Sequence, residues 1–304
     1  MYRLVRLGGV LSAVAAISIG ASVTRTPGGD TVRVYRLKLD PFVAPPTRLV
    51  GMIVRTRVNG GPPLRLLLDS GANMITLDPK SAAKSNCAGG IDLDLVGAGA
   101  QAAAGAKQVR AATVEIGDLL LRDVPLLISG KALGEGIQGV LPLSIFSAFL
   151  IRLDVPRKTL DLLPYPAESP DGSENLRALT TNNLLFVRGT VNGRREGYFL
   201  LDTGASYIAL SKTLARELNL SEALAERVPL QGGTTELDAP LVRGDIRLRF
   251  GTRELEAGSV VTVDLSVGSR YHNLDIAGLL GFPALSGSVL VVNYRDGLVR
   301  IDSR

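Results

Sequence analysis

The chain has 304 residues and a formal net charge of +5, and 46% of its residues are hydrophobic. This length suits two domains of ordinary size, and the apolar share is too large for a disordered chain. A single cysteine, Cys87, and a single histidine, His272, exclude an internal disulfide and a closed Cys/His zinc site. The Arg and Lys residues are scattered and form no basic cluster, so we expect no nucleic-acid partner.

The N-terminal segment, residues 1–25, has the pattern of an export signal. Arg3 and Arg6 precede an uncharged run that ends in small residues. This order is typical of a secretory signal peptide. An uncleaved membrane anchor is the alternative, because the run is only slightly too short to span a bilayer. In both cases we expect an exported protein, either periplasmic, secreted or anchored outside the cytoplasm. Residues 24–45 are a candidate pro-segment.

The first half, residues 32–165, predicts short strands joined by turns. An Asn-Gly pair, Asn59-Gly60, lies between alternating apolar residues, which is a strong hairpin signal. The phrase LLLDSGA follows, and then DPKSAAK, where Asp78 can cap and Pro79 can open a short helix. A Gly-rich stretch at 96–107, the phrase GVLP and a closing hairpin complete this half.

The second half, residues 176–304, repeats this order after a linker at 166–175 that is rich in Pro, Ser, Gly and acidic residues. Asn192-Gly193 precedes FLLDTGA, and Ser211 can cap the helix that follows. The phrase GLLG and a hairpin close the half. The chain is therefore predicted to be an internal duplication of a β-rich unit. The absence of regular βα alternation argues against a doubly wound parallel sheet.

The repeated phrase carries the candidate chemistry. Asp69 and Asp202 each follow three apolar residues and begin a tight turn, in which Gly71 or Gly204 would permit an unusual backbone conformation. A pseudo-two-fold axis between two duplicated units would bring the two carboxyl groups face to face. Such a pair cannot easily carry two charges, so it shares a proton. One carboxyl can then act as a base and the other as an acid on a water bound between them, which can attack a carbonyl.

The two phrases, each with a downstream apolar-apolar-Gly phrase, resemble those of the aspartic proteases of the pepsin and retropepsin clan. The resemblance implies an all-β, bilobal acid-protease fold, with two similar β-barrel-like lobes and short helices related by a pseudo-two-fold axis. It also implies an aspartic endopeptidase that acts on a protein or peptide substrate without a metal or organic cofactor. Because both lobes belong to one chain, we expect a monomer.

The resemblance also assigns roles to individual residues. It makes Asp69 and Asp202 the catalytic pair. The residues it places in support of the active-site loops are Ser70 and Thr203, whose hydroxyls would lock the loops together, Gly71 and Gly204, which would let the chain turn beneath the carboxylates, and Gly278 and Gly281 of the GLLG phrase.

Three departures from the family pattern stand out. Pro142 occupies the place that Gly281 has in the second half, which could distort support for the Asp69 loop. The Gly-rich stretch at 96–107 lacks the flap tyrosine of pepsin-like enzymes, so it is either a lid or an exposed loop, and residues 231–240 are a second flap candidate. Ala72 and Ala205 lack hydroxyls that could stabilise ionised carboxylates, so we expect activity at mildly acidic to near-neutral pH.

Two other interpretations compete with the endopeptidase. The first is a non-catalytic protein on the same bilobal fold that binds a peptide or partner. The second is an envelope β-sandwich with a structural role, which leaves the doubled phrase to coincidence. The Asp in both copies favours the enzyme, because a binding protein does not need a carboxylate pair.

Overall fold

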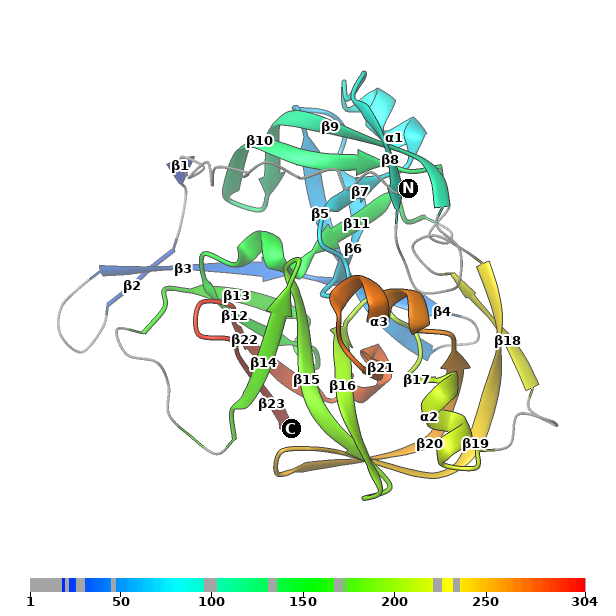
Figure 1. Cartoon of the computed structure of the whole chain (residues 1–304). Helices are drawn as coiled ribbons and strands as arrows, with labels where there is room; N and C mark the ends of the chain where they lie inside the picture. Colours follow the sequence, from blue (N-terminus) through cyan, green and yellow to red (C-terminus); the bar gives the residue numbers. More distant parts are fainter. Residues whose placement is uncertain are drawn as a thin grey trace.

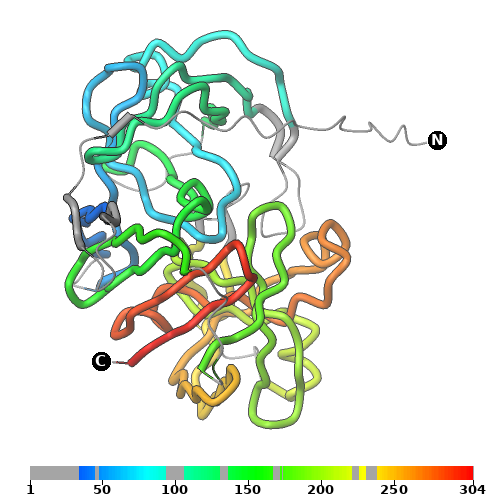
Figure 2. The backbone as a smooth tube through the Cα atoms, turned by 90° about the vertical axis from the view of Figure 1, so that its left-hand side faces the viewer, coloured from blue at the N-terminus to red at the C-terminus, as the bar shows by residue number. Residues whose placement is uncertain are grey.

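The computed structural model describes residues 18–19, 22–25, 31–44, 48–95, 103–130, 136–166, 172, 174–220, 226–231 and 236–303. The chain forms two lobes, with the first half above the second in the orientation of Figure 1 (Figures 1 and 2). Strands dominate, and the described helices α1 (Pro79–Lys84), α2 (Lys212–Glu217) and α3 (Ser266–His272) are short. The predicted all-β, bilobal architecture is confirmed.

The sheet of the upper lobe has the strand order β1-β10-β7-β11-β6-β5-β9-β8, with β4 paired to β5. Its strands are β1 (Ser18–Ile19), β4 (Asp40–Ala44), β5 (Arg48–Val58), β6 (Leu64–Asp69), β7 (Ile75–Leu77), β8 (Ile91–Leu95), β9 (Ala103–Ile116), β10 (Leu119–Ile128) and β11 (Gly139–Pro142). Parallel pairing of β6 with β11 places Asp69 at the last position of a central strand.

The second sheet contains the strands of the lower lobe and also joins the two halves. Its strands are β2 (Ser22–Arg25), β3 (Thr31–Lys38), β12 (Leu150–Asp154), β13 (Thr159–Leu163), β14 (Leu176–Thr181), β15 (Leu184–Val191), β16 (Arg195–Asp202), β17 (Ala209–Ser211), β18 (Glu226–Gln231), β19 (Glu236–Phe250), β20 (Arg253–Val263), β21 (Ile276–Gly281), β22 (Ser288–Asn293) and β23 (Leu298–Ser303). Strand β12 of the first half pairs with β22 of the second (Figure 1). The closing hairpins of both halves therefore meet in one sheet, which connects the lobes.

The hairpins predicted from the Asn-Gly pairs are confirmed. Asn59 and Gly60 have φ values of 50° and 68°, and Asn192 and Gly193 have values of 52° and 62°. Positive φ at both central residues matches the twist of the flanking strands, which are β5 with β6 and β15 with β16. Each hairpin delivers the strand that ends at an aspartate.

The predicted helix starts are also confirmed. Asp78 Oδ1 accepts a hydrogen bond from the backbone N–H of Ser81 at 2.8 Å, and Pro79 opens α1. Ser211 Oγ accepts from the N–H of Leu214 at 3.1 Å at the start of α2. These caps satisfy donors that a short helix leaves free, which matters because helices this short gain little stability from their own backbone.

The carboxylate strands lie between apolar layers. Leu66 and Leu68 of β6 are buried in the large common core, whereas Leu67 packs on the opposite face against Ile53 and Ile137. Because side chains alternate along a strand, Asp69 shares the face of Leu67. The side chains of β16 alternate in the same way. Phe199 and Leu201 are buried in the large common core, and Leu200 lies on the opposite face, which is the face of Asp202.

Several sequence predictions fall outside the described residues. Residues 1–17 of the expected signal or anchor segment are not described. Strands β1 and β2 lie in its last part, within residues 18–25. Within the described ranges, no helix combines the length and apolar character needed to cross a bilayer. Residues 167–171 and 173 of the expected linker are also not described.

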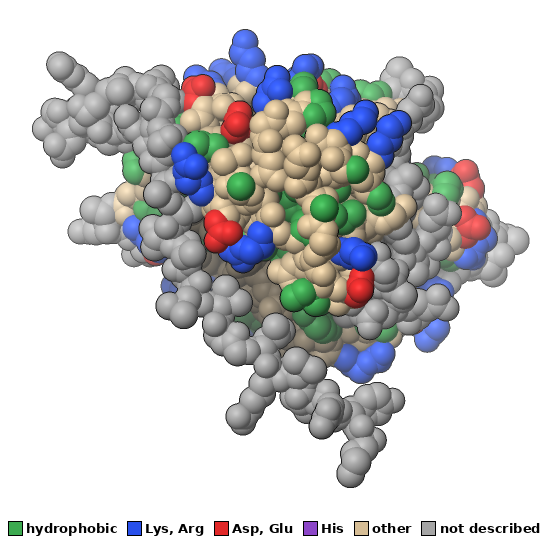
Figure 3. Space-filling model, turned by 90° about the horizontal axis from the view of Figure 1, so that it is seen from above, with side chains coloured by type: hydrophobic (Ala, Val, Ile, Leu, Met, Phe, Trp, Pro, Cys, Tyr) green, Lys and Arg blue, Asp and Glu red, His purple; other side chains and the backbone are tan. Residues whose placement is uncertain are grey.

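On the face of the molecule seen from above, Lys and Arg side chains are spread among hydrophobic and acidic ones (Figure 3).

The close approach of two strands explains a glycine in the GLLG phrase. A Cβ added at Gly278 would collide with the backbone carbonyl of Ala209 and lie 2.8 Å from the ring of Phe199. We expect Gly278→Ala to lower the free energy of unfolding by about 1–3 kcal/mol, because the neighbouring strand must shift. Urea denaturation would measure this change. Gly287→Ala is the control, since a Cβ there meets nothing within 4 Å; equal losses in both variants would contradict the steric explanation.

Candidate active site

The structure brings the two aspartates together at the ends of β6 and β16, between the lobes. A Cβ added at Gly71 would lie 2.5 Å from the Cγ of Asp202, and one at Gly204 would collide in the same way with the carboxyl group of Asp69. Each carboxyl group therefore lies directly against the turn of the opposite lobe. Both aspartates are half-buried and keep some contact with solvent.

This geometry corrects the expected reason for the turn glycines. The sequence suggested that Gly71 and Gly204 permit an unusual backbone conformation, but neither is among the described residues with positive φ. What these positions require is space, because any side chain would enter the volume of the opposite carboxyl group. The glycines thus allow the two turns to approach each other.

Ser70 and Thr203 join the two turns by a reciprocal set of hydrogen bonds. The backbone N–H of Ser70 donates to Thr203 Oγ1 at 2.9 Å, and the N–H of Thr203 donates to Ser70 Oγ at 3.0 Å. Ser70 Oγ also donates to the carbonyl of Leu201 at 2.7 Å, and Thr203 Oγ1 donates to that of Leu68 at 2.9 Å. Both residues are buried, so these bonds are shielded from competing water.

The two carboxyl groups have unequal hydrogen-bond partners. Asp69 Oδ1 accepts from the N–H of Gly71 at 2.7 Å. Asp202 Oδ1 accepts from two N–H groups, those of Gly204 at 3.0 Å and Ala205 at 2.9 Å. The carboxyl groups also hydrogen-bond each other. Backbone donors favour the ionised form of both groups, since the N–H of Gly204 also lowers the pKa of Asp69.

The pKa values of both carboxyl groups are raised, first of all by burial. Burial raises the pKa of Asp69 well above its usual range, and the negative charge of Asp202 raises it further. Burial also raises the pKa of Asp202, but the hydrogen bond from Asp69 and the backbone donors oppose that rise. Both pKa values are raised, so the pair shares one proton, and its two ionisation steps belong to the pair.

The downstream glycine phrases lie where the sequence analysis expected support for the loops. Gly281 pairs with Asp202 in parallel register, and Pro142 pairs with Asp69 in the same way. Pro142 has φ −66° and ψ 138°, an ordinary extended conformation, so the proline leaves the pairing intact.

The loop after Asp202 is held more tightly than the loop after Asp69. A Cβ at Gly281 would collide with the carbonyl of Tyr207, and the N–H of Phe282 donates to the carbonyl of Ala205 at 2.8 Å. The equivalent bond in the upper lobe, from Leu143 to Ala72, is not formed between these two described residues. The loop after Asp202 therefore has a backbone bond that its counterpart lacks among the described residues.

The two flap candidates correspond to hairpins, one in each lobe. Strands β8 and β9 pair antiparallel around residues 96–102, and β18 and β19 pair around residues 232–235. Both tips lie outside the described residues. Whether either hairpin covers a substrate stays a prediction.

One contact between the lobes had no signal in the sequence. The guanidinium of Arg48, at the start of β5, lies 4.2 Å from the ring centroid of Tyr207, five residues after Asp202. Tyr207 belongs to the repeated phrase, but nothing in the sequence linked Arg48 to it. The apolar cluster of Ile53, Leu67 and Ile137 was also missed, although strand alternation places Leu67 beside Asp69.

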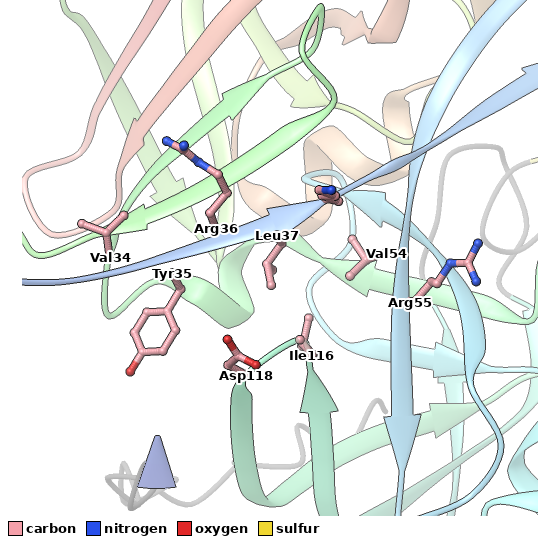
Figure 4. A pocket seen from close by; sticks show the side chains of 10 residues that line it. Val34, Tyr35, Arg36, Leu37, Val54, Arg55, Ile116 and Asp118 are labelled. Atoms are coloured by element: carbon pink, nitrogen blue, oxygen red, sulfur yellow. The ribbon is translucent and has the colours of Figure 1, made fainter. Parts of the chain in front are cut away.

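A separate cavity of about 340 Å³ lies between β3, β5 and the β9–β10 turn. Leu37, Ile116 and Asp118 face it, whereas Arg36 and Arg55 point away (Figure 4). No residue of either aspartate turn lines it, so it is not part of the candidate active site.

The single cysteine and histidine occupy ordinary structural positions. Cys87 is buried and free, and burial raises its pKa. His272 packs against Phe186 and Tyr271 with ring centroids 5.2 Å and 5.0 Å away. Over the described part of the chain, no three His, Cys, Asp or Glu side chains gather in a way that could hold a metal ion.

Comparisons with known proteins agree with the fold and with the duplication. A family model described as aspartyl protease matches residues 54–145 and again 187–284, and each match contains one aspartate phrase and one downstream glycine phrase. The fold is similar to the crystal structure of aspartic proteinase from Irpex lacteus, with a TM-score of 0.57 and 12% sequence identity, over 89% of this chain and 97% of that one. No protein with a curated function matches the sequence.

The hydroxyl bonds between the turns lead to a stability prediction. Thr203→Val keeps the shape of the side chain but leaves the buried N–H of Ser70 and the carbonyl of Leu68 without their partner. We expect a loss of unfolding free energy on the order of 3 kcal/mol, since unsatisfied buried polar groups are costly. Thr203→Ser retains the hydroxyl and should lose far less. Equal urea midpoints for the two variants would contradict this role.

Proposed function

Because the chain belongs to the aspartyl protease family, we propose that it is an aspartic endopeptidase that uses Asp69 and Asp202 to activate a water molecule. The observation that carries the proposal is the packing of each carboxyl group against the turn that bears the other, in two equivalent turns of a duplicated unit. Two half-buried carboxyl groups with one shared proton can supply a base and an acid at the same place.

The unequal surroundings of the carboxyl groups suggest how the proton moves. Asp202, ionised and supported by two backbone donors, accepts a proton from the bound water as the water oxygen attacks the peptide carbonyl carbon. Asp69 gives its proton to the carbonyl oxygen, which forms a neutral tetrahedral intermediate. As the intermediate collapses and the C–N bond breaks, the proton taken from water passes from Asp202 to the leaving nitrogen. One hydroxyl of the intermediate returns its proton to Asp69 as the carboxylic acid product forms, which restores the starting state of the pair.

An extended polypeptide is the substrate class that suits this site. Apolar residues border the carboxyl pair on both lobes, with Leu67 beside Asp69 and Leu200 beside Asp202. A chain that passes between the lobes could place side chains against both surfaces at once, on either side of the scissile bond. Contacts on both sides of that bond are what cleavage within a chain requires, and they support an endopeptidase.

The monomeric state and the export that the sequence predicts are also part of this proposal. Since one chain supplies both carboxyl groups, a monomer would be complete as an enzyme. The N-terminal sequence pattern supports export, with the signal peptide and the anchor both retained as alternatives. Protein or peptide substrates outside the cytoplasm would then be the ones available.

Replacing either aspartate tests the proposal directly. We expect Asp69→Asn and Asp202→Asn each to lower kcat for cleavage of a mixed peptide library by about a thousandfold or more, because each removes one half of the acid–base pair. Mass spectrometry of the products would measure this. Asp118→Asn, an exposed aspartate away from the pair, is the control. Tight peptide binding without cleavage by the unaltered chain would instead support the non-catalytic alternative.

The pH dependence of cleavage provides a second test. The active form carries one shared proton, so the rate falls at low pH when Asp202 is protonated and at high pH when Asp69 loses its proton. Both pKa values are raised above the ordinary aspartate value. We therefore expect a bell-shaped profile of kcat/KM with its maximum at mildly acidic to near-neutral pH. A maximum below about pH 3, well under the ordinary aspartate pKa, would contradict it.

A further inference from the structure

The contact between Arg48 and Tyr207 crosses from one lobe to the other. Arg48 is exposed at the start of β5, and its guanidinium lies 4.2 Å from the ring centroid of Tyr207. Tyr207 is half-buried and packs against the smaller core of the lower lobe. Its backbone carbonyl lies against Gly281, so the ring stands on a firmly held loop. The guanidinium is therefore supported by a rigid surface of the opposite lobe.

The strand register places Arg48 at the same end of the upper sheet as the catalytic turn. Strand β5 runs antiparallel to β6 with Ile53 opposite Leu67. Because the strands are antiparallel, the start of β5 at Arg48 lies toward the end of β6 that carries Asp69. Arg48 lies beyond the level of Asp69, toward the lower lobe, where β5 also contacts the turn η2 (Phe282–Ala284).

The distance from Tyr207 to Asp202 is bounded by the chain between them. Tyr207 follows Asp202 by five residues, and fully extended residues span at most about 3.6 Å each, so the Tyr207 Cα lies within about 18 Å of the Asp202 Cα. An extended substrate covers that distance in about five residues. A substrate held at the carboxyl pair can therefore reach Arg48 with a residue near its scissile bond.

Arg48 retains its capacity to bind an anion. Within the described ranges it forms no ion pair, whereas the nearby Arg55 is paired with Asp40 at 2.9 Å. Stacking on an aromatic ring occupies one face of a guanidinium and leaves its N–H edge available. That edge matches a carboxylate in a bidentate geometry, and the stacking reduces the entropy lost on binding.

We propose that Arg48, supported by Tyr207, is a specificity-determining residue that binds the side-chain carboxylate of a Glu or Asp within about five residues of the scissile bond. The inference rests on the proposed endopeptidase activity and names its substrate class, which is polypeptides with an acidic residue at one fixed position. Since the ion pair forms at an exposed site, its contribution is moderate and decreases as salt rises.

A matched peptide series tests this inference. The probes are fluorogenic peptides that carry either Glu or Gln at each of the five positions on both sides of the bond that is cleaved. We expect kcat/KM to favour Glu over Gln by about three- to tenfold at one position, as for an accessible bidentate ion pair. In Arg48→Met this ratio should fall to about one. Arg65→Met is the control, because Arg65 is exposed on the neighbouring strand and forms no ion pair among the described residues.

Variants of Tyr207 test whether its contact with Arg48 serves recognition of the substrate carboxylate or only attaches the two lobes to each other. Tyr207→Phe retains the ring face and should retain the Glu preference, whereas Tyr207→Leu removes the stacking surface and should reduce it. A uniform loss of activity in Arg48→Met with an unchanged Glu/Gln ratio would overturn the inference, because Arg48 would then only link the lobes. An equal loss of the ratio in Arg65→Met would also overturn it, since the preference would come from general charge.

Failure of the proposed function would look different. In that case no peptide is cleaved by the unaltered chain, and fluorescence anisotropy of the same peptides replaces kinetics. An Arg48-dependent preference for Glu in binding would support the carboxylate site on a binding protein. Equal binding of Glu and Gln peptides by the unaltered chain and by Arg48→Met would overturn it.

Discussion

The reciprocal hydrogen bonds between Ser70 and Thr203 are the constraint on which the candidate active site depends. Two like-charged carboxyl groups repel each other when both ionise, so something else must hold their turns together. Here each hydroxyl accepts from the backbone of the opposite turn and donates to a carbonyl of the strand that leads into that turn. Because the bonds are buried, separating the turns would leave several polar groups without partners at a high cost in free energy.

This attachment makes the small size of Gly71 and Gly204 necessary. Once the turns are held in contact, each carboxyl group occupies the space in which a side chain of the opposite turn would lie. The close approach also explains the raised pKa of Asp69, since the carboxyl group is shielded from water and lies beside a second acid. Attachment, packing and proton sharing are thus consequences of one contact between the lobes.

The two lobes are similar in fold but not in detail, and the differences affect chemistry. Asp202 has two backbone donors and a loop clasped by Gly281, whereas Asp69 has one donor from its own turn and a loop next to Pro142. A duplicated unit could give two equivalent acids, but here the two carboxyl groups of the pair have different surroundings. The contact of Arg48 with Tyr207 adds a further asymmetry, because it connects the upper lobe to the loop after Asp202 alone.

The sequence by itself determined the duplication, the hairpins at Asn59 and Asn192 and the capped helices, because these depend on local backbone preferences and on spacing. It also indicated Asp69 and Asp202, since two copies of one phrase imply two equivalent turns. Only the tertiary structure decided why the turn glycines are needed, how β12 and β22 join the halves, and that Arg48 meets Tyr207. These features depend on atoms from distant segments that come within contact distance only after the chain folds.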